Sequence, residues 1–125
     1  MDRKDSDSEG AITASRTLIE SVCKAILDEQ GIKYDDGDDL PSLYKQTSQS
    51  LNLSPSQHTE QIFKQILTGC ISTITGLGAL RNKVSDAHGK GKVYSKPSPR
   101  HAESMVNLSG ALSSFLIQTL KKDEA

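Results

Sequence analysis

The spacing of apolar residues constrains the fold of this chain more than any other feature of its sequence. Apolar side chains recur at intervals of three, four and seven residues along most of the chain, which is the period of an amphipathic helix. No segment alternates between apolar and polar residues as a half-buried strand would. We therefore predict helices over residues 11–30, 40–53, 54–88 and 98–121, packed as an all-α bundle of four main helices with a basic loop between the last two.

Residue types at the predicted helix ends support these bounds. Gly31 is suited to ending the first helix, because glycine readily adopts the left-handed conformation of a C-terminal cap. Ser54 and Gln57 have the spacing of a capping box, and Pro55 between them suits a first helical position, so we expect the third helix to begin here. Ser98 is also followed by proline and predicts the N-cap of the fourth helix.

The predicted third helix is apolar over a face wider than one neighbouring helix would cover, so two packing surfaces are expected on it. Gly69, Gly76 and Gly78 lower its intrinsic helix propensity. These glycines would allow the close approach of another helix or a bend, and a merely tolerated glycine is an equal alternative. The apolar positions are Ile62, Phe63, Ile66, Leu67, Cys70, Ile71, Ile74, Leu77, Leu80 and Val84.

The length of 125 residues fits a single domain. We assign that domain to residues 11–122, after a disordered polar leader over residues 1–10 and before a short tail over residues 123–125. No apolar run approaches the ~20 residues that span a bilayer, and the charged N-terminus lacks the apolar block of a signal peptide. The composition therefore indicates a cytoplasmic protein without a membrane partner.

The two cysteines, Cys23 and Cys70, lie in apolar helical segments and lack the CxxC or Cys/His spacing of a zinc site. We interpret them as buried thiols in a reducing compartment. The sequence also contains no glycine-rich phosphate loop. We therefore expect no metal, no cofactor and no nucleotide hydrolysis.

Charge is distributed unevenly along the chain. Residues 1–39 carry eleven acidic and five basic side chains, whereas residues 81–101 carry six basic side chains and one acidic one, Asp86. A cluster of this kind can bind nucleic-acid phosphates, although a solvated charged loop has the same composition. The six basic residues are Arg81, Lys83, Lys90, Lys92, Lys96 and Arg100.

Four polar residues within "RNKVSDAHG" form the main candidate site. Arg81 and His88 are seven residues apart, which is about two turns, so both can project toward one side if the helix persists that far. Asn82 and Asp86 lie between them. A structural interpretation remains open, in which the histidine caps a helix end before Gly89 and Arg81 pairs with Asp86.

The segment "RNKVSDAHG" resembles the R-N-x(4–6)-H motif of HEPN domains. The wider chain resembles the abortive-infection C-terminal family (Abi-C), a branch of the HEPN superfamily, over about residues 15–120. The resemblance is carried by "SRTLIESVCKAILDEQGIKY", "DLPSLYK", "SQHTEQIFKQILTG", "GLGALRNKVSDAHGKG" and "SPRHAESMVNLSGALSSFL".

The resemblance implies a metal-independent endoribonuclease from a prokaryotic abortive-infection or toxin-type antiviral defence system. It also implies a homodimer whose two motifs face one cleft, and an antitoxin or sensor domain as a further partner. His88 would move protons, Arg81 would stabilise phosphoryl charge and Asn82 would orient them, with Asp86 possible as a tuning group. The expected RNA phosphate contacts are Lys83, Lys90, Lys92, Arg100 and His101.

Several other residues carry smaller expectations. We predict that Arg16 and Glu20 form an ion pair at i, i+4, that His58 is structural or solvent-exposed, and that Tyr94 could stack on one RNA base. A second function stays open, in which the chain is a non-catalytic helical dimer that binds RNA or protein and the motif is structural.

Overall fold

The computed structural model describes residues 3–90 and 98–124, and within them the side chains of residues 8–79 and 98–122. The elements in chain order are α1 (Arg3–Glu29), α2 (Leu40–Ser50), the short 3-10 helix η1 (Pro55–Gln57), α3 (Gln61–Lys90) and α4 (Pro99–Glu124). The described residues contain four α-helices and no strand, so the predicted all-α bundle is confirmed.

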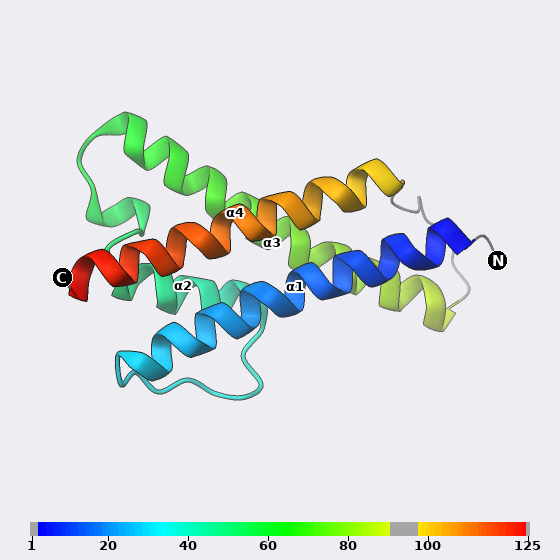
Figure 1. Ribbon diagram of the computed structural model, residues 1–125, viewed down its shortest axis with the longest axis horizontal. Helices are drawn as coiled ribbons and strands as arrows, with labels where there is room; N and C mark the ends of the chain where they lie inside the picture. The colour runs from blue at the N-terminus through cyan, green and yellow to red at the C-terminus, as the bar shows by residue number, and fades with distance from the viewer. Residues whose placement is uncertain (1–2, 91–97, 125) are drawn as a thin grey trace.

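Helices α1 and α4 pack against each other over much of their lengths and run in the same direction (Figure 1). The short helix α2 packs against both α1 and α3, and α3 runs opposite to α1 and α4. As a result, the C-terminal end of α3 lies at the same end of the molecule as the first turns of α1 and α4 (Figure 1). This end carries the candidate motif.

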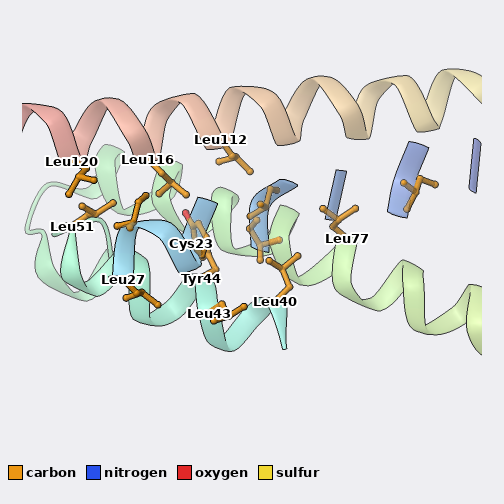
Figure 2. Close-up of a cluster of buried hydrophobic side chains, with 14 of the residues drawn as sticks. Cys23, Leu27, Leu40, Leu43, Tyr44, Leu51, Leu77, Leu112, Leu116 and Leu120 are labelled. Carbon is orange, nitrogen blue, oxygen red and sulfur yellow. The ribbon is translucent and has the colours of Figure 1, made fainter. Parts of the chain in front are cut away.

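The core is built mainly from leucine and isoleucine side chains of all four helices. Leu112, Leu116 and Leu120 of α4 point into the bundle toward α1 and α2 (Figure 2). Tyr44 of α2 is 2% exposed and lies beneath them, near Cys23 of α1. Burial of such side chains from water is the main term that holds the bundle together.

Local hydrogen bonds end α1 where the sequence predicts. Gly31 adopts a φ of 71°, and the backbone N–H of Ile32 donates to the carbonyl of Leu27 at 2.9 Å. The N–H of Gly31 donates to the carbonyl of Asp28 at 3.1 Å, which completes a Schellman cap. The predicted glycine stop is confirmed.

The prediction that the third helix begins at Ser54 is wrong, because the separate short helix η1 lies there. The side chain of Gln57 accepts a hydrogen bond from the backbone N–H of Ser54 at 2.9 Å, as a capping box requires. However, this box opens η1, and α3 begins only at Gln61. The chain is extended at His58, whose Nε2 lies 2.6 Å from the carbonyl oxygen of Asn52, so the helix cannot continue through this residue.

Other helix bounds also differ from the sequence-based expectation, and α2 ends at Ser50, three residues before its predicted end. Residues 3–10 form the first turns of α1 in place of a disordered leader, and Ser8 is only 3% exposed. Helix α3 continues through Gly89 and Lys90, where a loop was expected. Helix α4 extends to Glu124, three residues beyond its predicted end, and its predicted N-cap is confirmed because Ser98 Oγ accepts from the N–H of His101 at 3.4 Å.

Candidate functional site

Helix α3 carries Arg81, Asn82 and His88 on one uninterrupted segment. Because the helix continues to Lys90, positions 81 and 88 are about 20° apart around its axis, the offset of seven residues at 3.6 per turn. The backbone is therefore helical from position 81 to position 88, as the predicted two-turn alignment of these positions requires. Gly89 lies inside the helix, so α3 does not end at a glycine cap directly after His88.

Positions 81 and 88 continue a line of α3 that is buried farther back along the helix. Ile74 and Leu77 on this line are 1% and 2% exposed, and Cys70 one turn earlier is half-buried. Alternating steps of four and three residues lead from position 70 through 74, 77, 81 and 84 to 88. The motif thus occupies the register of the core-facing line of α3.

The spacing of this line can be recognised in the sequence, but only the fold shows that the line faces the core. The wide apolar face of α3 holds two parallel lines with the same spacing, and only the burial of Ile74 and Leu77 identifies the inner one. The side chains of Arg81, Asn82, Lys83, Asp86, His88 and Lys90 lie outside the described side chains, and Lys92, Tyr94 and Lys96 lie outside the described residues.

Two predicted phosphate-binding residues are described. Arg100 and His101 lie in the first turn of α4, and both are exposed. This turn shares one end of the molecule with the C-terminal part of α3 (Figure 1). The N-terminus of a helix also carries partial positive charge, which adds to that of Arg100. The fold therefore brings these two residues to the motif end of the molecule.

Comparison with protein families identifies the group to which the chain is related. A family model described as the HEPN-like domain Abi_C matches residues 1–120. The chain belongs to the Abi_C family. Neither the search of curated proteins nor the search of solved structures found a match.

The match spans nearly the whole chain. It includes residues 3–10, which form the first turns of α1. Family and fold agree, because a HEPN-like domain is a helical module and the described residues are all-helical or irregular.

The predicted ion pair on α1 is confirmed. Arg16 Nη2 lies 2.9 Å from Glu20 Oε1, with side chains that are 17% and 22% exposed. Arg16 also lines a groove of about 210 Å³ together with Thr75 and Gly78 of α3. The pair is thus placed beside α3 about one turn before Arg81. Sequence spacing predicted the pair but not the groove, because the groove depends on how α1 packs against α3.

His58 is structural, as predicted. Its Nε2 bonds to the Asn52 carbonyl, and its ring lies 6.4 Å from that of Phe63. This histidine holds the turn between η1 and α3 and lies at the opposite end of α3 from the motif.

The thiols are suited to packing rather than to chemistry. Cys23 is fully buried, and this burial raises its pKa to about 11. Cys70 is half-buried and its pKa is also raised by burial. A thiol with a raised pKa is a poor nucleophile and metal ligand at neutral pH. Among the described side chains, no group of three or more His, Cys, Asp or Glu residues is arranged to hold a metal ion.

A search for membrane-crossing segments covered the same part of the chain. None of the described helices combines the length and the apolar character that a bilayer crossing requires.

Proposed function

We propose that this Abi_C protein is a metal-independent endoribonuclease that acts as the effector of a prokaryotic abortive-infection or toxin-type defence system. One observation carries the proposal. A member of the HEPN-like Abi_C family has the R-N-x5-H motif on a single unbroken helix, with Arg81 and His88 in the same register two turns apart.

The proposed reaction is attack of a ribose 2′-hydroxyl on the adjacent phosphate. A bond forms between phosphorus and O2′, the bond from phosphorus to O5′ breaks, and the products are a 2′,3′-cyclic phosphate and a free 5′-hydroxyl. His88 moves the proton from O2′ toward O5′, because imidazole, with an ordinary pKa of ~6.5, exists in both forms near neutral pH. The reaction needs no water and no metal ion.

Arg81 is the proposed partner of the phosphate itself. A guanidinium is permanently charged and can donate two parallel hydrogen bonds to the non-bridging oxygens, where charge builds during the attack. Asn82, the next residue, would orient Arg81, His88 or the phosphate by neutral hydrogen bonds. Asp86 is proposed only as a group that tunes His88.

RNA is the proposed partner of the cationic residues around the motif. Lys83, Lys90, Lys92, Arg100 and His101 would contact phosphates on either side of the cleaved bond without reading base identity. Binding should therefore weaken as salt concentration rises, since counterion release supplies much of the affinity. A second copy of the chain and an antitoxin or sensor protein complete the proposed set of partners.

Substitution of His88 tests this proposal. His88→Ala should lower the rate of RNA cleavage by at least ~100-fold, the usual contribution of a general acid–base group, while circular dichroism and the melting temperature stay near wild type. His58→Gln is the matched control, because it removes a histidine that only supports a turn. Full cleavage by pure His88→Ala would contradict the proposal.

The same samples distinguish the non-catalytic alternative. If the motif is only structural, the wild type will not cleave RNA, and Arg81→Ala will lower the free energy of unfolding by more than ~1 kcal/mol, as loss of a buried charged hydrogen bond does. The endoribonuclease proposal predicts the reverse, with lost cleavage and nearly unchanged stability.

A further inference from the structure

The groove of about 210 Å³ beside Arg16 lies where α1, the start of α2 and α3 meet. Sites that hold drug-sized ligands measure ~300–1,000 Å³, so this groove fits a single flat ring system. Gly78 keeps the space beside the Pro41 ring open, because a Cβ atom at this position would lie 3.5 Å from Pro41 Cδ. The residues that line the groove include Arg16, Asp39, Pro41, Thr75, Gly78 and Ala79.

The groove directly precedes the motif along α3. Thr75 and Ala79 are four residues apart, and Asn82 follows Ala79 by three residues, so these positions share one side of the helix. At a rise of ~1.5 Å per residue, Gly78 is ~4.5 Å along the helix axis from Arg81. A ligand in the groove would therefore lie next to the phosphate that Arg81 is proposed to bind.

Arg16 has hydrogen-bond donors left for a ligand. Its Nη2 lies 2.9 Å from Glu20 Oε1, and this ion pair holds the guanidinium, whose side chain is 17% exposed. The guanidinium makes no other hydrogen bond or ion pair within the described residues. Because a guanidinium carries five N–H donors, several of them can bind a molecule in the groove.

Asp39 supplies an acceptor from a different wall of the groove. Its Oδ1 accepts a hydrogen bond from the backbone N–H of Ser42 at 2.9 Å, which fixes the carboxylate at the start of α2. Its Oδ2 accepts no hydrogen bond from any residue that the structure describes. The groove therefore offers donors from α1 and a carboxylate acceptor from the loop before α2.

The charges around the groove disfavour a phosphate as its ligand. Glu20 compensates the charge of Arg16, and Asp39 adds a second carboxylate, so negative charge is in excess. A phosphate brought into this groove would be repelled. A neutral base that has both acceptors and donors on its edges can use Arg16 and Asp39 together.

We propose that the groove is a base-reading subsite that binds one guanine of the RNA, beside the cleaved bond. Arg16 donates to O6 and N7 of the guanine, and Asp39 accepts from its N1–H and N2–H groups. Among the four RNA bases, guanine alone has two neighbouring acceptors and two neighbouring donors. The inference rests on the proposed function and deepens it by naming a base that the substrate carries.

Binding of RNA that cannot be cleaved tests the subsite without relying on catalysis. Short 2′-O-methyl oligouridylates with one central guanine or one central adenine lack the hydroxyl that the reaction needs. By fluorescence anisotropy, the wild type should bind the guanine probe at least ~10-fold more tightly, as one bidentate contact allows. Equal affinity for the two probes, or no binding of either, would overturn the subsite.

Modified bases assign the contact of each side chain. Hypoxanthine lacks the N2 amino group and 7-deazaguanine lacks N7, so the wild type should bind both probes more weakly than the guanine probe. Asp39→Asn keeps an oxygen for the Ser42 cap and should stay folded, but it should no longer distinguish hypoxanthine from guanine. Arg16→Gln should no longer distinguish 7-deazaguanine from guanine.

Asp36→Asn is the matched control, because it changes an exposed carboxylate of the same loop. It should keep the wild-type preference for guanine. A folded Asp39→Asn protein that still prefers guanine to hypoxanthine, or loss of the preference in Asp36→Asn, would contradict the assignment.

The two proposals can be told apart when they fail. A protein that binds the guanine probe selectively but does not cleave RNA would contradict the proposed function and leave the subsite standing. A protein that cleaves RNA with no guanine at a fixed position beside the cut would contradict the subsite alone.

Discussion

At the scale of single residues, Tyr44 occupies an unusual position in the core. Its side chain is 2% exposed, and its hydroxyl makes no hydrogen bond of good geometry to any described residue, only a weak contact with the Cys70 thiol. The thiols of Cys70 and Cys23 lie close enough to influence it, and burial raises the pKa of Tyr44 far above its ordinary value. Tyr44 is therefore kept neutral by its surroundings, as Cys23 is.

These shifts predict a loss of stability at alkaline pH. A pKa that is raised in the folded state means that the folded protein keeps its proton longer than the unfolded chain does. The stability from Cys23 and Tyr44 is therefore complete below their ordinary pKa values of 9.0 and 10.0 and decreases as pH rises above them. Thermal melts between pH 7 and 11 should show the melting temperature falling once the pH exceeds the ordinary Cys23 pKa of 9.0.

Tyr44→Phe isolates the contribution of the phenol. At pH 7 the free energy of unfolding of the variant should be within ~1 kcal/mol of the wild-type value, because the lost hydroxyl makes only a weak contact with the Cys70 thiol. Above pH 10 its melting temperature should fall less steeply than that of the wild type. Equal slopes for the two proteins would show that Tyr44 is not the titrating group.

Residue-level prediction from sequence worked where the interaction is local. The Arg16–Glu20 pair follows from its spacing on one helix, and the structure confirms it at 2.9 Å. The environment of Tyr44 could not be predicted in this way, because its neighbours Cys23 and Cys70 come from two other helices.

At the scale of helices, capping residues decide where most elements begin and end. Asp39 Oδ1 accepts a hydrogen bond from the backbone N–H of Ser42 at 2.9 Å and so caps α2, whose first turn includes Pro41. Helix α2 ends at Ser50; Asn52, just beyond it, adopts a φ of 61°, and the N–H of Leu53 donates to the carbonyl of Ser48 at 2.7 Å. The start of this short helix therefore depends on the side chain of Asp39, and its end depends on the backbone conformation of Asn52.

Removal of the α2 cap should have a measurable cost. Asp39→Ala should lower the free energy of unfolding by about 1 kcal/mol, the usual value for loss of an N-cap acceptor. Asp36→Ala removes the same charge from an exposed position of the same loop and should change stability much less. Urea titrations of both variants measure the difference, and an equal effect of the two would contradict the capping role.

Local signals also explain which helix bounds the sequence predicts correctly. The Gly31 stop and the Ser98 cap are determined by residues within one turn, and both predictions are confirmed. The capping box at Ser54 is equally local, but it does not determine how long the helix after it becomes. The break at His58 depends on Asn52, six residues earlier, and the burial of Ser8 in the first turns of α1 is a tertiary effect that no local signal predicts.

At the scale of the whole molecule, helical periodicity was sufficient for the fold class, whereas the family was indicated by the resemblance of particular segments and is shown by the family model. It was not sufficient to show which line of α3 is buried, because both lines have the same spacing. Burial of Ile74 and exposure of Ile66 distinguish the inner line, which leads to Arg81 and His88, from the exposed line beside it.

Metal-free cleavage of RNA is the most direct test of the central claim that Arg81 and His88 act together on one phosphate. The purified protein should be incubated with mixed RNA in EDTA, and the ends of the fragments should be determined. The account predicts fragments that end in a 2′,3′-cyclic phosphate, produced by the wild type and lost in His88→Ala. Intact RNA with the wild-type protein, or fragments that appear only when a divalent metal is added, would contradict it.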